Sequence, residues 1–165
     1  MDRFLAAVVQ MASGPHRDAN LQRARALIEQ AAARGARLVV LPEVFAWRGP
    51  RADEAAHAET IPGPTTEAMS ALARATGILL CMGSILEHVP NERRSFNTSC
   101  LLGPDGALLA RYRKIHLFDV DLPGRVTVRE SDARAPGDET VVVPTELGVL
   151  GMSCLLYTSP SPRDS

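Results

Sequence analysis

Residues 37–43 read Arg-Leu-Val-Val-Leu-Pro-Glu, an apolar run that stops at a proline and a carboxylate. Such a run is typical of a strand that is buried on both faces. Residues 4–11 form a second near-continuous apolar run, for which we expect the same burial. Between the two runs, apolar residues follow the spacing of an amphipathic helix that should end at Gly35: Leu21, Ala24, Leu27, Ile28 and Ala31. Strand, helix and strand within about 40 residues predict a βαβ unit, and therefore an α/β fold with a parallel sheet.

The next part of the chain predicts a loop, a helix and a strand. Residues 47–58 are charged and irregular, and we expect a loop at the carboxyl edge of the sheet. The turn-forming residues 62–66 introduce a helical pattern that should end at Gly77. Residues 78–85 are apolar again and predict a third strand.

The second half of the chain begins with a hairpin signal. The turn Gly-Pro-Asp-Gly at 103–106 should join two strands at 96–102 and 107–113. Residues 119–140 are rich in Asp, Arg, Pro and Gly and predict a long loop. Two further short strands are expected, at 141–143 and 148–153.

The chain divides into one domain and a dissimilar terminal segment. Residues 1–153 contain no internal repeat and no linker, which predicts a single domain. Residues 159–165 have no periodicity and no apolar face, and residues 154–164 resemble the translation of an adapter used in sequencing libraries. We therefore expect residues 154–165 to be a non-native tail on the N-terminal part of a longer domain.

Composition excludes several classes of function. The 165 residues carry 18 basic and 19 acidic side chains, so the net charge of −1 does not favour a nucleic-acid partner. The sequence has no apolar run of the roughly 20 residues that a membrane span needs, and no signal peptide. Its three cysteines, an odd number, are typical of a reducing compartment. We therefore expect a cytoplasmic protein.

Two charged residues stand where chemistry is expected. Glu43 directly follows a predicted strand, and the carboxyl ends of strands line the ligand crevice of α/β sheets. Partial burial there would raise the pKa of its carboxyl group towards the range of a general base, although a solvated loop glutamate is the alternative. Lys114 is the only lysine among the 18 basic residues. An arginine cannot replace a lysine whose compact ammonium is needed, although chance and an ordinary edge-strand lysine are alternatives.

Other common sites receive no support from the sequence. The four histidines, His16, His57, His88 and His116, show no paired spacing, and no Cys-x-x-Cys motif is present. A zinc site is therefore not expected. The sequence also contains no glycine-rich nucleotide motif, so nucleotide binding is not expected.

Three segments in order resemble landmarks of the nitrilase (carbon–nitrogen hydrolase) superfamily. They are Leu-Pro-Glu at 41–43, Tyr-Arg-Lys-Ile-His-Leu-Phe-Asp at 112–119, and Gly-Met-Ser at 151–153. Phe-Asn-Thr at 96–98 and Glu-Ser-Asp at 130–132 fit between them. The segment from Lys114 is similar to the ω-amidase and deaminated-glutathione-amidase branches. The resemblance implies an α-β-β-α sandwich of the nitrilase type, of which this chain would hold about the first half.

The resemblance also implies a role for each matching residue. Glu43 would be the general base, Lys114 would stabilise the tetrahedral intermediate, and Glu130 would orient the lysine and the substrate. A cysteine would form a thioester with the substrate and be freed by water. The whole protein would thus hydrolyse the C–N bond of a small carboxylated amide without a cofactor, usually as a homodimer or a higher homo-oligomer.

The nucleophile is where the sequence departs from the family. The family pattern is Gly-x-x-x-Cys, whereas Cys154 follows Gly151 one residue too early. Because successive strand residues face opposite sides, this slip should point the Cys154 thiol away from the site. We therefore expect the native nucleophile to lie elsewhere and the 165-residue chain to be inactive. The alternatives are a Cys154 nucleophile in altered register, a non-catalytic pseudoenzyme or interaction scaffold, and a thioester-dependent N-acyltransferase.

Overall fold

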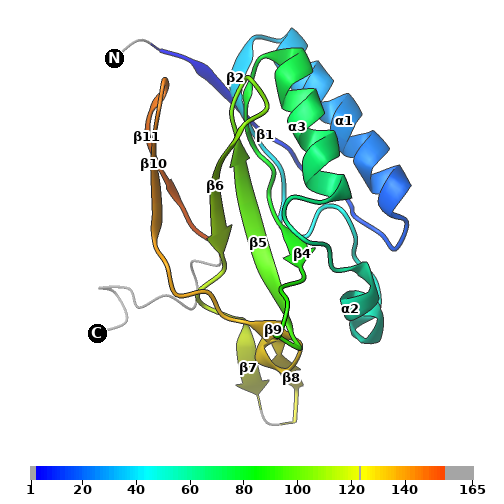
Figure 1. Ribbon diagram of the computed structural model, residues 1–165. Coiled ribbons are helices and arrows are strands. Elements are labelled where there is room, and N and C mark those ends of the chain that lie inside the picture. The colour runs from blue at the N-terminus through cyan, green and yellow to red at the C-terminus, as the bar shows by residue number, and fades with distance from the viewer. Residues whose placement is uncertain (1–2, 123, 155–165) are drawn as a thin grey trace.

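The computed structural model describes residues 3–122 and 124–154. Its largest sheet has seven strands, and the longest of them, β5, pairs on both of its sides (Figure 1). The strands of this sheet are β1 (Leu5–Val8), β2 (Ala36–Val40), β3 (Leu79–Cys81), β4 (Ile85–Glu87), β5 (Ser95–Leu102), β6 (Leu108–Arg113) and β9 (Arg134–Ala135).

The main sheet is mixed, with both parallel and antiparallel pairs of strands. Strands β1, β2 and β3 are parallel, as the βαβ pattern predicts. Strands β3 and β4 follow one another antiparallel along one side of β5, and β6 is antiparallel along its other side. The short strand β9 runs parallel to the beginning of β5. The predicted hairpin around residues 103–106 is therefore confirmed as β5 and β6.

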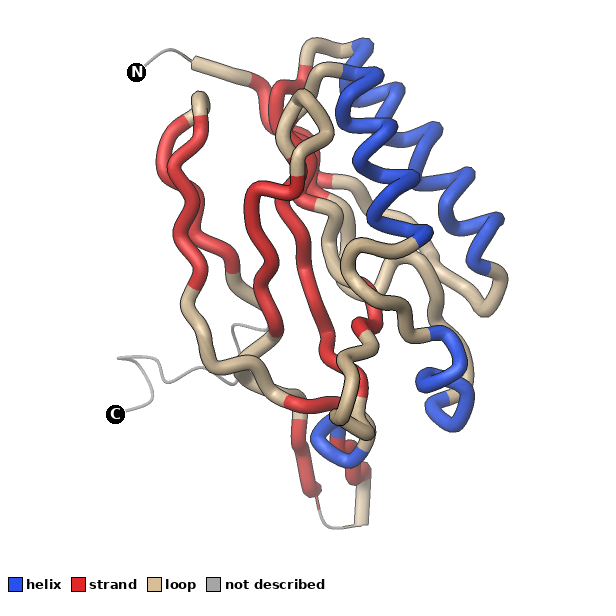
Figure 2. The backbone as a smooth tube through the Cα atoms, viewed as in Figure 1, coloured by secondary structure: helices blue, strands red, loops and turns tan. Residues whose placement is uncertain are grey.

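Two helices form a layer on one face of the sheet (Figures 1 and 2). They are α1 (Arg17–Ala33) and α3 (Pro64–Thr76), and α3 ends at Gly77, whose φ of 64° is the left-handed conformation that glycine adopts readily. Ile28 of α1 and Leu80 of β3 are fully buried between this layer and the sheet. Burying an aliphatic side chain of this size contributes about 1.5–3 kcal/mol.

A hairpin forms a further layer on the opposite face of the sheet. It consists of β10 (Val141–Thr145) and β11 (Gly148–Met152), which pair antiparallel. Leu147, at its turn, belongs to a cluster with Leu79 and Leu101 of the main sheet. The described residues thus supply one helical and two β layers, in the order that the predicted sandwich requires.

Several local expectations are corrected by the structure. β1 is not buried on both faces, because it is the edge strand and its Val8 is 85% exposed. The strand expected over 78–85 is broken at Gly83, whose φ of 60° and close approach to the Pro42 carbonyl exclude a side chain. Residues 47–58 contain a 3-10 turn and the one-turn helix α2 (Glu54–His57).

The loop expected over 119–140 contains regular structure. Strands β7 (Asp119–Leu122) and β8 (Val126–Arg129) form a separate antiparallel ribbon, followed by a 3-10 turn at Glu130–Asp132. Each strand alternates apolar and polar residues, as Asp-Val-Asp-Leu and Val-Thr-Val-Arg, but four residues are a short signal in a segment rich in Asp, Arg, Pro and Gly.

Two sequence-based expectations extend beyond what the structure describes. Of the segment 154–165, only Cys154 is described, so the expected change of character at this point stays a prediction. Within the described ranges, each helix is too short or too polar to cross a membrane.

Candidate functional site

Glu43 lies three residues after the end of β2, at the carboxyl edge of the parallel strands. Its Oε1 atom accepts hydrogen bonds from Lys114 Nζ at 3.0 Å and from Asn97 Nδ2 at 2.6 Å. The Glu43 side chain is 37% exposed, so it also faces solvent. The next residue, Val44, has a φ of 51°, an uncommon value for a β-branched residue, and its N–H donates to Ser84 Oγ. This strained turn carries the chain away from the sheet at Glu43.

The ionisation of Glu43 differs from the sequence-based expectation. Burial acts to raise the pKa of its carboxyl group, but the hydrogen bond and charge of Lys114, together with the Asn97 amide, outweigh burial and lower that pKa. The expected rise towards neutral pH is therefore wrong, because it took no account of a cation in contact. At neutral pH, Glu43 is a carboxylate that can accept a proton.

Lys114 lies directly after β6 and is 2% exposed. Its Nζ donates to Glu43 and to both carboxylate oxygens of Glu130, at 3.2 Å to Oε1 and 2.9 Å to Oε2. Burial acts to lower the pKa of Lys114, but the two glutamates outweigh burial and raise it. Lys114 is thus a fixed cation at the centre of the site. Glu43 and Lys114, which are 71 residues apart in the sequence, are brought together as the resemblance implies.

Glu130 begins the 3-10 turn after β8 and is buried. Its Oε2 accepts the N–H of Phe118 at 2.7 Å, and its Oε1 accepts Arg134 Nη1 at 2.7 Å. Burial acts to raise its pKa, but the Phe118 N–H, Lys114 and Arg134 lower it overall. Glu130 is therefore held in place by a backbone donor and two cations.

Arg134 connects the site to α2. Besides Glu130, it contacts both carboxylate oxygens of Glu54, at 2.8 and 3.2 Å, and this pair is largely buried. Sequence reasoning missed Arg134, Glu54 and Asn97 as members of the site. Asn97 stands in the Phe-Asn-Thr segment that resembles the family, whereas Arg134 and Glu54 carry no signal, because their pairing joins residues 80 positions apart.

Cys154 is also close to the site, contrary to the expectation from its spacing. Its Sγ lies 3.5 Å from Glu43 Oε1. The alternation argument fails because β11 ends at Met152, so that Cys154 follows in irregular chain and is not bound to the strand geometry. Burial, and then the negative charge of Glu43, raise the pKa of the Cys154 thiol to about 12.

A cleft of about 480 Å³ opens next to these residues. Glu43, Lys114 and Glu130 line it, and Arg48 and Arg51 contribute two further cations. Neither arginine forms an ion pair with the part of the chain that the structure describes. The volume suits a small molecule, and the spare positive charge favours an anionic one.

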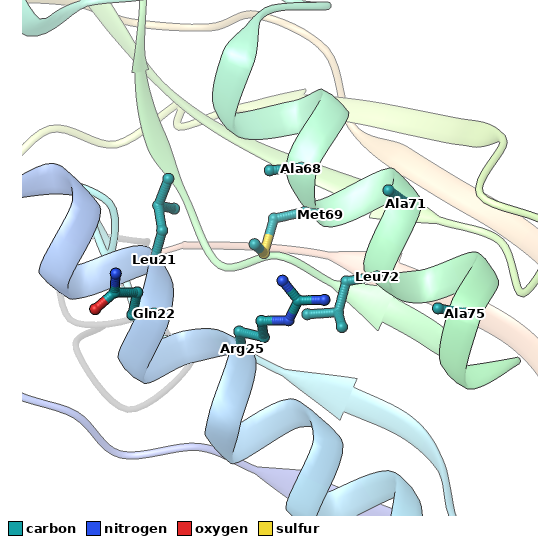
Figure 3. Close-up of a pocket in the computed structure, with 8 residues that line it drawn as sticks. All are labelled: Leu21, Gln22, Arg25, Ala68, Met69, Ala71, Leu72 and Ala75. Carbon is teal, nitrogen blue, oxygen red and sulfur yellow. The ribbon is translucent and has the colours of Figure 1, made fainter.

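The remaining candidates in the described residues are less suited to chemistry. A cleft between α1 and α3 is lined mainly by apolar side chains such as Met69 and Leu72, and Arg25 of α1 also lines it (Figure 3). Cys100 is fully buried, and burial raises the pKa of its thiol to about 12. No group of three or more potential metal-ligating side chains occurs within the described ranges.

The ion pairs of the fold predict a loss of stability in acid. Folding lowers the pKa values of three glutamates, Glu43, Glu87 and Glu130, from the ordinary value of 4.5. Their ion pairs therefore stabilise the fold fully above about pH 4.5. This stabilisation disappears as the pH falls through the lowered pKa values of the folded chain. We expect the free energy of unfolding, measured with urea, to decrease steadily from about pH 5 downwards. A free energy of unfolding that stays constant between about pH 5 and pH 2 would contradict this prediction.

The sequence as a whole matches known carbon–nitrogen hydrolases. Residues 5–155 match the family model described as carbon-nitrogen hydrolase. The chain is 41% identical to omega-amidase NIT2 of Xenopus tropicalis over 152 residues, which cover 92% of this chain and 54% of that protein. It is also 41% identical to omega-amidase NIT2 of Homo sapiens over 138 residues, or 84% of this chain and 49% of that protein.

Solved structures agree with this assignment. The structure of the C. elegans NitFhit protein matches with a TM-score of 0.81 and 33% identity, covering 90% of this chain and 37% of that one. Nit3 of Saccharomyces cerevisiae, described as a member of branch 10 of the nitrilase superfamily, matches with a TM-score of 0.75 and 31% identity over 88% of this chain and 54% of that one. The chain spans about half the length of the curated relatives it matches. It belongs to the carbon–nitrogen hydrolase family and has the mixed α/β fold of the nitrilase superfamily.

Proposed function

We propose that the whole protein hydrolyses the C–N bond of a small carboxylated amide through a cysteine thioester. The observation that carries this proposal is the position of Lys114 Nζ, which contacts both Glu43 and Glu130 at the wall of a cleft. A cation and a solvent-facing carboxylate 3.0 Å apart can stabilise an oxyanion and move a proton in the same place. The similarity to proteins named omega-amidase supports the same chemistry.

In the proposed reaction, Glu43 accepts and returns each proton. Glu43 accepts the thiol proton while the sulfur attacks the amide carbon, and Lys114 stabilises the negative charge that develops on the carbonyl oxygen. The C–N bond then breaks, and the Glu43 carboxylic acid returns the proton to the departing ammonia. A water molecule next gives its proton to Glu43 and attacks the thioester. The C–S bond breaks, Glu43 returns this proton to the sulfur, and the acid product leaves, so that both the thiol and the Glu43 carboxylate are restored. Glu130 keeps Lys114 in position throughout.

The cations of the cleft support a carboxylated substrate. Arg48 and Arg51 line the same cleft as Lys114, and Arg51 Nη1 donates to the carbonyl of Arg129, which holds that guanidinium in place. A substrate carboxylate bound by these arginines would hold the amide at the other end of a short chain near Glu43. A short ω-amide such as succinamic acid has this form.

We propose that neither a metal nor an organic cofactor takes part in the reaction, because the steps above use side chains alone. We also propose a cytoplasmic homodimer or higher homo-oligomer. The exposed apolar side chains Val8, Val142 and Val149, on three strands, support association with further protein surface.

We further propose that the 165-residue polypeptide itself releases no ammonia. The chain spans about half the length of its curated relatives. In addition, Cys154 holds its proton tightly, with a pKa of about 12, whereas the pKa of Glu43 is lowered, so transfer of the thiol proton to Glu43 is strongly uphill. A thiol in this state is a poor nucleophile.

Ammonia release by the purified 165-residue chain tests this second proposal. With succinamic acid as substrate, we expect the wild-type chain and its Cys154→Ser variant to give the same rate as buffer. Release of ammonia by the wild-type chain that disappears in Cys154→Ser would show that Cys154 is a working nucleophile and would overturn the proposed inactivity.

A further inference from the structure

We propose that Asn97 is a positioning residue that holds both Glu43 and Lys114 in the geometry of the site. Its catalytic significance rests on the function proposed above, but its effect on Glu43 can be measured without any turnover. Asn97 lies within β5, between the segments that carry the two charged residues, and is 1% exposed. It is therefore a fixed part of the sheet against which the two charged residues are aligned.

Asn97 contacts the two residues with different atoms. Its side-chain Nδ2 donates to Glu43 Oε1 at 2.6 Å, and its main-chain carbonyl accepts the N–H of Lys114 at 2.8 Å. The first contact fixes a side chain that follows β2, and the second fixes the backbone of a residue that follows β6. A single residue of the central strand thus contacts both the side chain of Glu43 and the backbone of Lys114, which come from opposite sides of it.

The contact with Asn97 determines how Glu43 is oriented. Within the described residues, the hydrogen bonds to the Glu43 carboxylate all reach Oε1, from Asn97, Lys114 and Cys154, and none reaches Oε2. Two of these donors, Asn97 and Cys154, are uncharged, and Asn97 is the more buried of the two. Without it, the carboxylate would be held by Lys114 and the Cys154 thiol alone and would be free to turn towards solvent.

The other end of the Asn97 amide indicates that this residue serves more than packing. Its Oδ1 atom is buried and has no hydrogen-bond partner among the described residues. A buried polar atom without a partner costs free energy, so an apolar side chain of similar size would suit a purely structural position better. Departures of this kind from the usual packing rules are concentrated at functional sites.

The neighbouring residue provides a matched comparison. Thr98 is also fully buried in β5, and its Oγ1 donates to Glu87 Oε2 at 2.7 Å. Because successive residues of a strand face opposite sides, Asn97 and Thr98 support different carboxylates, the solvent-facing Glu43 and the buried Glu87. Glu87 is held by Arg111 and Arg113 and does not line the cleft that Glu43 faces. Replacing Thr98 by valine therefore removes a comparable buried donor without touching the site.

The test is a titration of the Glu43 carboxyl group by carbon-13 NMR in the 165-residue chain, with the signal assigned from its absence in Glu43→Gln. We expect Asn97→Leu to raise the pKa of Glu43 by about one unit, a tenfold increase in proton affinity, because a hydrogen bond to the charged form is lost. We expect Thr98→Val to leave the pKa of Glu43 unchanged. Asn97→Ser, whose hydroxyl is too short to reach Glu43, should reproduce the shift if Asn97→Leu does not fold.

Two results would overturn the proposal. One is a folded Asn97→Leu or Asn97→Ser chain in which Glu43 titrates as in the wild type. The other is a shift in Thr98→Val as large as that in the Asn97 variants, which would mean that any loss of a buried donor in β5 disturbs the site. Neither outcome depends on amide hydrolysis, so a failure of the proposed function leaves this test intact.

Discussion

Replacing Lys114 by methionine is expected to lower the free energy of unfolding by about 3 kcal/mol at neutral pH. The methionine fills a similar volume, but it leaves the buried carboxylate of Glu130 with one cation instead of two and removes the only cation that contacts Glu43 within the described residues. Removing one partner of a buried ion pair costs more than the pair contributes, because the remaining charge stays desolvated. Urea unfolding of the two chains measures the difference.

The dependence on pH identifies the cause of this loss. As the pH falls below the ordinary glutamate value of 4.5, the two carboxylates become protonated, and the difference between Lys114→Met and wild type should shrink. Arg25→Met is the control, because its pair with Glu29 is exposed on α1 and should contribute less than about 1 kcal/mol. Equal losses in the two variants would mean that the buried position of Lys114 carries no special weight.

Replacing Glu43 by glutamine is expected to reduce amide hydrolysis by the whole protein about 10³-fold. Glutamine has nearly the same shape and keeps a hydrogen-bonding oxygen, but its amide cannot accept a proton from a thiol or from water. The change should therefore lower kcat, with a smaller effect on KM. Ammonia release from succinamic acid, measured with the whole protein over a range of substrate concentrations, gives both constants.

The control for this prediction is Glu92→Gln, which changes a carboxylate that is paired with Arg94 and does not line the cleft. It should keep wild-type kcat and KM. A Glu43→Gln enzyme with wild-type activity would exclude Glu43 as the base.

Adding hydroxylamine during turnover distinguishes hydrolysis from acyl transfer. If hydroxylamine intercepts all of the acyl group and water none, the acyl group passes from the thioester to amines and the acyltransferase alternative applies.

Local patterns were sufficient to predict most of the framework. The apolar run before Glu43 and the turn at 103–106 predict the two segments whose ends carry Glu43 and Lys114, because burial and turn formation depend on residues that are close in the sequence. The family resemblance supplied what local pattern could not, namely that these two ends meet. The β7–β8 ribbon was missed because its strands have only four residues each and lie in a segment whose Asp, Arg, Pro and Gly content is typical of a loop.

The electrostatics of the site depend on contacts that the sequence does not encode locally. The direction of the Glu43 pKa shift is set by Lys114 and Asn97, which are remote in the sequence, and so an argument from burial alone gave the wrong sign. In the same way, the orientation of Cys154 could not be obtained from strand alternation, because the strand ends before it. Long-range pairs such as Arg134 with Glu54 require the fold itself.

The proposed reaction depends on a cysteine beside Glu43 and Lys114 that carries the substrate as a thioester. The most direct test is rapid acid quenching of the whole protein during turnover of succinamic acid, followed by mass spectrometry of its peptides. We expect one succinyl group on a cysteine, which hydroxylamine removes and which does not form in Glu43→Gln. Turnover without any acylated cysteine, or with the acyl group on another residue, would contradict it.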